Sequence, residues 1–134
     1  MKTFTDYCKD FIIENIDEHK GRTTYAEEIG YMITDRINID GSAEYSTYNA
    51  IEYLKSWWYD CADYINYEKD NFGELAHNPF EEPEAFHVCM ITAGVNNLLY
   101  QCDVISENCN EEIKLTPQII ERIKDEVQDK EIQL

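Results

Sequence analysis

Apolar side chains recur at steps of three and four residues along most of this chain, which is the spacing of one face of an α-helix. The spacing predicts helices over about residues 4–19, 24–36, 46–72 and 84–102, and a last one from residue 117 onward. In the 84–102 segment apolar residues lie on nearly all sides, so we expect this helix to be the buried centre. The pattern therefore predicts an all-α, or mainly α, single domain of about five helices over residues 1–134.

Capping residues indicate where these helices begin. Side chains of Ser and Thr can accept hydrogen bonds from the first free backbone N–H groups, and Pro suits the first turn because it lacks that donor. The expected starts are Thr3, Thr24 with Glu27 as a capping box, Ser46, Pro83, and Thr116 followed by Pro117.

The remaining segments carry turn and surface signals. Residues 38–42 have turn chemistry, and Ile37 and Ile39 beside them are compatible with a short extended segment. Gly73 is expected to end the 46–72 helix. The polar stretch 104–114 is interpreted as a surface connection, and the last residues are expected to fray.

Composition is typical of a folded protein, because 43% of the residues are apolar and ten are Tyr. The first residues lack the apolar core of a signal peptide, and no run of about 18 apolar residues occurs. We therefore expect a cytoplasmic protein. Its five Cys form no CxxC pair, and four of them, Cys8, Cys61, Cys89 and Cys102, fall on apolar helical stripes, so we expect small buried side chains rather than disulfides.

Negative charge is the outlying feature of the composition. The chain has 28 Asp and Glu against 11 Lys and Arg, a net charge of −17, which disfavours direct binding to nucleic acid or an anionic membrane. Residues 23–87 hold 14 of the acids and three of the bases, so most of the excess lies in the centre of the chain. A charged face that serves only solubility is one explanation, and recognition of a basic partner is the other.

Aromatic residues interleaved with these acids favour recognition, because Tyr is enriched in interface centres and its ring stacks on guanidinium groups. At least one ring of Trp57, Trp58 and Tyr59 must face outward on a helix. Successive acids on such a helix would crudely imitate the phosphates of a nucleic acid. The candidate partner-binding residues are Glu52, Tyr59, Asp60, Asp63, Tyr67, Asp70, Glu74, Phe80, Glu81, Glu82 and Glu84.

Catalytic motifs are absent from the sequence, so we expect neither an enzyme nor a bound metal or cofactor. His87 and Cys89 beside Glu84 are chemically able to bind zinc, although a His-x-Cys spacing on a helix points the two side chains apart. A nucleophilic pair of Cys89 or Cys102 with His77 or His87 can be formulated, but no motif supports it.

Four short blocks carry a resemblance to a known group of proteins. They are GSAEYST at 41–47, YLKSWW at 53–58, DNFGE at 70–74 and, most distinctive, NPFEEPEAF at 78–86. Over residues 39–99 the chain resembles uncharacterised acidic proteins of conjugative elements and phages of gut Gram-positive bacteria. This resemblance implies a mobile element inside a host bacterial cell, and a role similar to that of antirestriction and anti-CRISPR proteins.

Together, charge and resemblance predict an anti-defence inhibitor that acts as an acidic DNA mimic. Its partner would be the basic nucleic-acid or PAM-binding groove of a host nuclease, either a restriction enzyme or a Cas effector such as Cas9. Alternatives are a non-enzymatic interaction or regulatory module of a mobile element and a small metal-dependent hydrolase. A homodimer is compatible with the sequence as well.

Overall fold

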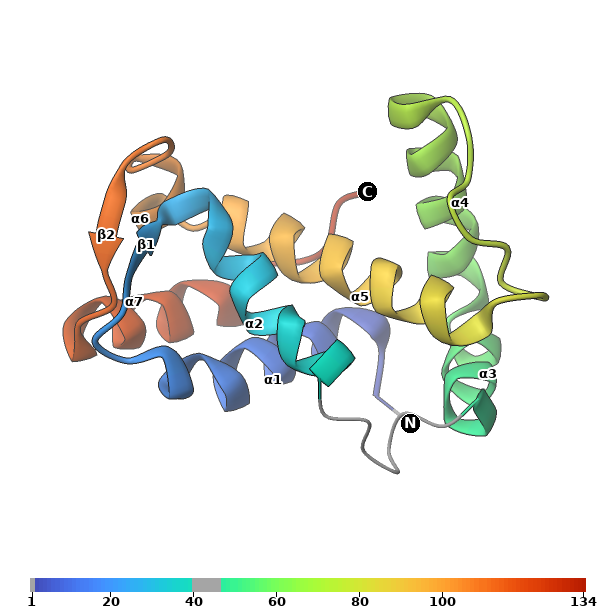
Figure 1. Cartoon of the computed structure of the whole chain (residues 1–134), viewed down its shortest axis with the longest axis horizontal. Helices are drawn as coiled ribbons and strands as arrows, with labels where there is room; N and C mark the ends of the chain where they lie inside the picture. Colours follow the sequence, from blue (N-terminus) through green and yellow to red (C-terminus); the bar gives the residue numbers. More distant parts are fainter. Residues whose placement is uncertain (1, 40–46) are drawn as a thin grey trace.

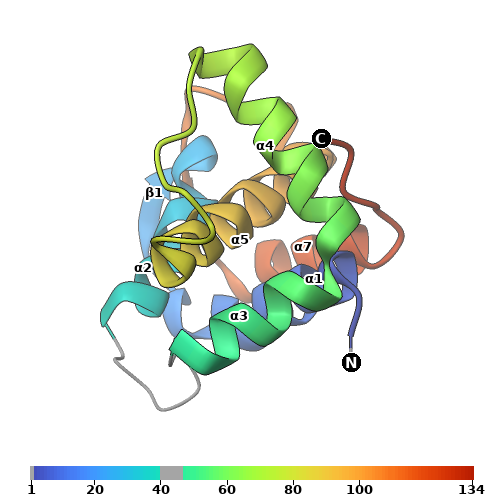
Figure 2. The same ribbon diagram turned by 90° about the vertical axis from the view of Figure 1, so that its right-hand side faces the viewer.

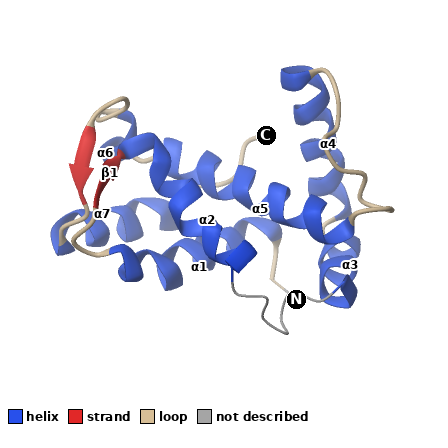
Figure 3. Ribbon diagram, viewed as in Figure 1, coloured by secondary structure: helices blue, strands red, loops and turns tan. Residues whose placement is uncertain are grey.

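A computed structural model describes residues 2–39 and 47–134 and confirms a mainly α-helical fold (Figures 1 and 3). The described part contains seven α-helices and one two-stranded antiparallel sheet. The helices are α1 (Phe4–Asn15), α2 (Ile29–Ile39), α3 (Thr47–Ser56), α4 (Trp58–Phe72), α5 (Pro83–Tyr100), α6 (Asp103–Ser106) and α7 (Pro117–Gln128). The strands are β1 (Thr23–Tyr25) and β2 (Glu112–Lys114), and the 3-10 turns are η1 (Ile16–His19) and η2 (Ala26–Glu28).

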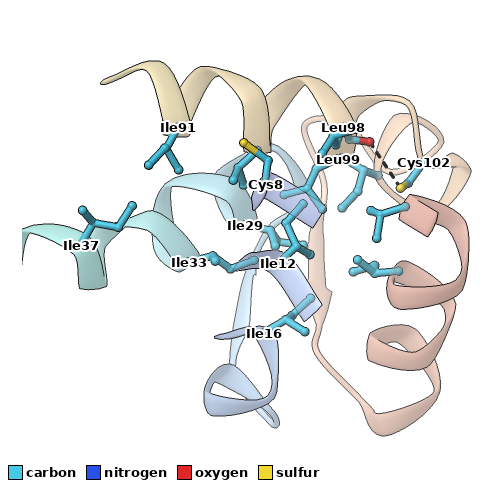
Figure 4. Close-up of a cluster of buried hydrophobic side chains, with 14 of the residues drawn as sticks. Cys8, Ile12, Ile16, Ile29, Ile33, Ile37, Ile91, Leu98, Leu99 and Cys102 are labelled. Atoms are coloured by element: carbon cyan, nitrogen blue, oxygen red, sulfur yellow. Dashed lines mark hydrogen bonds between the residues drawn. The ribbon is translucent and has the colours of Figure 1, made fainter. Parts of the chain in front are cut away.

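Helix α5 is the centre of the fold, as its all-round apolar pattern predicts. It contacts α1, α2, α3, α6 and α7, and most of its side chains are buried. Figure 4 shows Ile91, Leu98 and Leu99 of α5 facing isoleucines of α1 and α2. Pro83 stands in the first turn of α5, where its missing N–H costs nothing.

Two glycines allow close packing against α5, one where α2 crosses it and one where α1 crosses it. A Cβ atom on Gly30 of α2 would lie 1.8 Å from Asn96 Oδ1 of α5. On α5 itself, a Cβ atom on Gly94 would lie 2.7 Å from the Phe4 ring and 2.8 Å from the Cys8 sulfur of α1. Close packing at both crossings therefore requires a residue without a side chain.

The predicted start of the second helix is wrong. Thr24 does not cap a helix but lies in β1, paired with Ile113 of β2, and α2 begins only at Ile29. The prediction that residues 104–114 form only a surface connection is also wrong. Val104 and Ile105 are buried, and residues 112–114 form β2, the partner strand of β1. This pairing joins segments far apart in the chain, which a local capping pattern does not reveal.

Residues 37–39 are helical rather than extended, since α2 continues through Ile39 and Ile37 is buried. The first helix keeps its cap, with Thr3 Oγ1 accepting from Asp6 N at 3.1 Å, but α1 ends at Asn15 and η1 follows. Most of the predicted 38–42 turn and the Ser46 cap lie outside the described residues.

The predicted 46–72 helix is broken in two at Trp57. This residue has φ −105° and ψ 38°, outside the helical region, and separates α3 from α4. Its indole is buried, stacks on Tyr53 with ring centroids 4.9 Å apart, and donates from Nε1 to the Lys2 carbonyl at 2.9 Å. Helix α4 then ends as expected at Gly73, whose φ of 79° favours glycine.

The C-terminal residues do not fray. Helix α7 begins as predicted, with Thr116 Oγ1 accepting from Ile119 N. Beyond α7, Ile132 and Leu134 pack against the core, and Gln133 N donates to Asn97 Oδ1 of α5 at 2.9 Å. Within the described ranges, no helix combines the length and apolar character needed to cross a bilayer.

Candidate functional site

Residues 47–82, which we call the arm, comprise α3, α4 and the loop that returns to α5. In Figures 1 and 2, α4 extends from α3 past the body of the molecule, and the loop runs back along it. The arm is joined to α5 by an edge-to-face pair of Tyr64 and Phe86, with ring centroids 5.3 Å apart, and by the contact of Cys61 Sγ with Met90 Sδ at 3.6 Å. One side of α4 is therefore anchored in the core and the others face outward.

The returning loop is organised around Asn78. Its Oδ1 accepts from Phe80 N at 2.8 Å and from Glu81 N at 3.3 Å, and its carbonyl accepts from Glu82 N at 2.7 Å. A further contact joins His77 Nδ1 to Glu82 Oε2 at 3.2 Å. These bonds define the backbone around Phe80, whose ring is 80% exposed.

The predicted partner-binding residues divide by exposure. Seven are exposed: Tyr59, Asp63, Asp70, Glu74, Phe80, Glu81 and Glu82. Four are half-buried: Glu52, Asp60, Tyr67 and Glu84. Of these four, Glu52 pairs with Lys55 at 3.7 Å, and the Tyr67 ring packs edge-on against Phe72.

Only some of the acids share a surface. Tyr59, Asp63 and Asp70 lie on one outward face of α4, with Asp63 and Asp70 about 10 Å apart along the axis. Asp60 is instead half-buried, and its charge adds to burial in raising the pKa of the Cys8 thiol of α1. Partial burial, and then the charge of Asp63, raise the pKa of Asp60 above its ordinary value.

An apolar groove on the arm was not predicted from the sequence. It has a volume of about 260 Å³ and lies between α3, α4 and the returning loop. Its lining residues are Ile51, Leu54, Lys55, Trp58, Cys61, Ala62, Ile65, Pro79 and Phe80. Trp58 is 59% exposed and Phe80 is 80% exposed, so the groove presents two large aromatic side chains to solvent.

Ile51 and Trp58 line this groove and are both exposed. A signal for the groove does exist, because Ile51, Trp58 and Ile65 follow one another at seven-residue steps. That repeat forms a second apolar stripe beside the buried one of Leu54, Cys61 and Tyr64. Two stripes indicate two apolar surfaces, one covered by the core and one open.

Charge on the arm as a whole is mostly negative. The arm carries eight Asp and Glu against Lys55 and Lys69. Glu81 and Glu82 directly follow Phe80 in the chain and are exposed, whereas the charged residue that lines the groove is Lys55. The arm is thus acidic overall, and its groove is apolar.

His87 and Cys89 do not converge on a metal site. The His87 ring is buried between aromatic side chains, and this burial lowers its pKa to about 4. Burial raises the pKa of the Cys89 thiol, and raises that of Cys102 to about 12, so neither is an activated nucleophile. In the part of the chain that the structure describes, no three His, Cys, Asp or Glu side chains are grouped closely enough to hold a metal ion.

The arm thus combines an acidic helix face, exposed aromatic rings and an apolar groove, which are features of a surface that binds another macromolecule. Comparisons of the chain with protein-family models, with curated proteins and with solved structures found no significant match.

Proposed function

We propose that this protein is a non-catalytic inhibitor that binds the basic nucleic-acid groove of a host nuclease and blocks DNA binding by competition. The specific target would be the PAM-reading and phosphate-binding surface of a Cas effector, or the DNA-binding groove of a restriction enzyme. The observation that carries this proposal is the outward placement of Asp63, Asp70, Glu81 and Glu82 on the arm, together with Tyr59 and Phe80.

Electrostatics support a cationic partner. Like charges on one exposed helix face repel each other by a few tenths of a kcal/mol per pair, a small cost that a basic surface would relieve on binding. Arg and Lys in a nuclease groove would meet the carboxylates, and the exposed rings would supply the apolar contacts that exclude water. Binding of this kind is fast and weakens as salt concentration rises.

The resemblance of residues 39–99 to acidic proteins of conjugative elements and phages supports the setting. A protein of a mobile element gains from neutralising nucleases that destroy incoming DNA. We therefore place the proposed inhibitor in the host bacterial cytoplasm, with no direct contact to nucleic acid or membrane.

A plasmid-interference assay tests the proposal. Cells that carry a restriction or CRISPR system are transformed with a targeted plasmid, with and without this chain expressed. We expect the chain to restore transformation, and the purified protein to compete with DNA for the purified nuclease in a salt-dependent manner.

Charge reversal locates the surface. The arm variant carries Asp63→Lys, Asp70→Lys, Glu81→Lys and Glu82→Lys. The matched control carries Glu14→Lys, Glu112→Lys, Asp125→Lys and Asp129→Lys, which are exposed positions outside the arm with the same total change of charge. We expect protection to be lost in the arm variant and kept in the control; equal protection by both would refute the arm as the binding surface, and absence of protection against every nuclease tested would refute the function.

A second candidate function is a regulatory interaction module whose partner is a polypeptide other than a nuclease. The apolar groove favours it, because a mimic of phosphates alone has no need of two exposed rings beside a groove.

A further inference from the structure

Residues 131–134, with the sequence Glu-Ile-Gln-Leu, lie beside α5 after α7 has ended, and we call them the strap (Figure 1). We propose that the strap occupies a peptide-binding site on α5, and that the site also accepts an extended segment of a partner protein with apolar side chains at alternate positions. The strap would then be an internal ligand that closes the site until such a segment displaces it. This inference does not depend on the arm or on a nuclease.

Hydrogen bonds to the backbone of the strap are the first support. The amide of Asn97 makes a reciprocal pair with Gln133: Oδ1 accepts from Gln133 N at 2.9 Å, and Nδ2 donates to the Gln133 carbonyl at 3.3 Å. One turn further along, Gln101 Nε2 donates to the Glu131 carbonyl at 2.8 Å. A neighbouring β-strand would satisfy the strap in the same way. Because these bonds use no side chain of the strap, an extended segment of another sequence can form them too.

Side chains of the strap alternate between solvent and the protein. Glu131 and Gln133 are exposed, whereas Ile132 and Leu134 are half-buried and pack against the core. This is the period of an extended chain that lies with one face on a surface. In peptide recognition of this kind, backbone bonds supply affinity and contacts with alternate side chains supply selectivity. The site should therefore select apolar side chains at two positions separated by one residue.

Gly94 makes room for the first of these side chains. A Cβ atom on Gly94 would lie 3.0 Å from Ile132 Cδ1, closer than ordinary van der Waals contact. The same Cβ would lie 2.7 Å from the Phe4 ring of α1. The missing side chain on α5 therefore serves the strap as well as the α1 crossing, and it lets one apolar side chain reach the helix backbone.

The site is preorganised, and the strap is the part that can leave. Asn97 stands on α5 and Gln101 at its C-cap, and Gln101 Nε2 donates to Asn97 Oδ1 at 3.0 Å, which orients the Asn97 amide. The strap itself belongs to no helix or strand, and its apolar side chains are only half-buried. We therefore expect it to open at a lower free energy than global unfolding and to leave a formed site behind.

A partner protein fits the site better than a second copy of this chain. A second copy carries the right segment, but each copy has a net charge of −17, so two copies repel each other. The contacts with the strap use backbone groups and apolar side chains, so a partner segment needs no particular charge. Because the strap is tethered, a partner competes with an effective concentration in about the millimolar range. Weak ligands are thereby excluded from the intact protein.

The full chain with a weakened strap tests the inference. The open variant carries Ile132→Ser and Leu134→Ser, and the matched control carries Glu131→Ser and Gln133→Ser at the exposed positions of the strap. The probe is a fluorescent peptide with the sequence of residues 129–134, and anisotropy measures its binding. One control peptide has Ser in place of its Ile and Leu. Another is N-methylated at its Gln, which removes the N–H that Asn97 accepts.

Binding should require both the open site and the backbone bonds. We expect the open variant to bind the probe at least about ten-fold more tightly than wild type or the matched control do. Either control peptide, or Asn97→Ala added to the open variant, should lower that affinity at least about ten-fold. Circular dichroism checks folding, and Leu134→Ser alone replaces the open variant if the double change unfolds the chain.

Absence of binding to a folded open variant would overturn the inference, and so would equal affinity for the N-methylated peptide or the Ser peptide. A wild-type dimer in sedimentation experiments that Asn97→Ala dissociates would overturn the choice of partner, because a second copy would then occupy the site. The strap lies outside the arm, so these results are separate from plasmid protection and either proposal can fail while the other holds.

Discussion

The imidazole ring of His87 stacks on the ring of Tyr53, with centroids 5.3 Å apart and planes only 8° from parallel. Trp57 stacks on the same imidazole at 5.6 Å, so this helix-start histidine of α5 connects the core to α3 and to the break before α4. His87 is 1% exposed, and its burial lowers the pKa to about 4, so the ring is neutral in the folded protein at physiological pH.

Stability is therefore predicted to fall as the pH falls from about 6.5 to about 4. In this window the unfolded chain takes up a proton at His87 and the folded protein does not, which favours unfolding. The shift corresponds to about 3 kcal/mol of unfolding free energy, complete below pH 4 and absent above pH 7. Urea unfolding at several pH values measures it.

His87→Phe supplies the control, because it keeps an aromatic ring in the stack and removes the titration. The difference in unfolding free energy between wild type and variant should change with pH in favour of the variant toward pH 4. Parallel pH profiles for the two proteins would contradict this assignment.

The crossing of α2 and α5 gives a second prediction. Gly30→Ala places a Cβ atom where Asn96 Oδ1 now lies, and we expect a loss of about 1–3 kcal/mol of stability from the resulting displacement. Asn96→Ala removes the obstructing amide. The double variant should therefore be more stable than the sum of the two single changes, and simple additivity in thermal or urea unfolding would argue against a direct contact.

Local patterns were sufficient to predict most helices. The all-round apolar stretch of α5, the Thr116–Pro117 start of α7 and the end of α4 at Gly73 each depend on neighbours in sequence, and all three are confirmed. The strand pair of Thr24 with Ile113 depends on residues far apart in the chain, and it overrode a plausible capping box. Burial of the Trp57 indole, likewise a tertiary effect, divided one predicted helix into two.

In the candidate site, too, local sequence patterns do not reveal the features that depend on tertiary packing. Tyr59, Tyr67 and Phe80 are the rings that the sequence offers as candidate contacts, and the structure exposes Tyr59 and Phe80 but half-buries Tyr67. Periodicity cannot say which of two apolar stripes meets a core, so it does not reveal the groove that Trp58 lines. Nor can it show that Asp60 is half-buried while Asp63, three residues on, is exposed.

Thiol reactivity should separate the five cysteines. Cys8, Cys61 and Cys102 are buried and Cys89 is half-buried, whereas Cys109 is exposed. Burial raises the pKa of Cys61 and of Cys102 from 9.0 to about 12, which lowers the thiolate fraction roughly a thousand-fold. With a disulfide reagent at pH 8 we expect one rapid reaction per native chain, none in Cys109→Ser, and reaction of all five thiols in denaturant; two rapid thiols in the native protein would contradict the burial.

Neutralising the outward acids tests whether they contribute to folding. Partial burial, and after it the charge of Asp63, raise the pKa of Asp60, and a carboxyl whose pKa is raised by folding opposes folding at neutral pH. Asp63→Asn should therefore lower the pKa of Asp60 in an NMR titration and leave stability unchanged or raised by a few tenths of a kcal/mol. Asp70→Asn is the matched control: it lies further along α4 and should leave the Asp60 titration as in wild type. A loss of more than about 1 kcal/mol in either variant would mean that these acids stabilise the fold, and the case for their serving recognition would be lost.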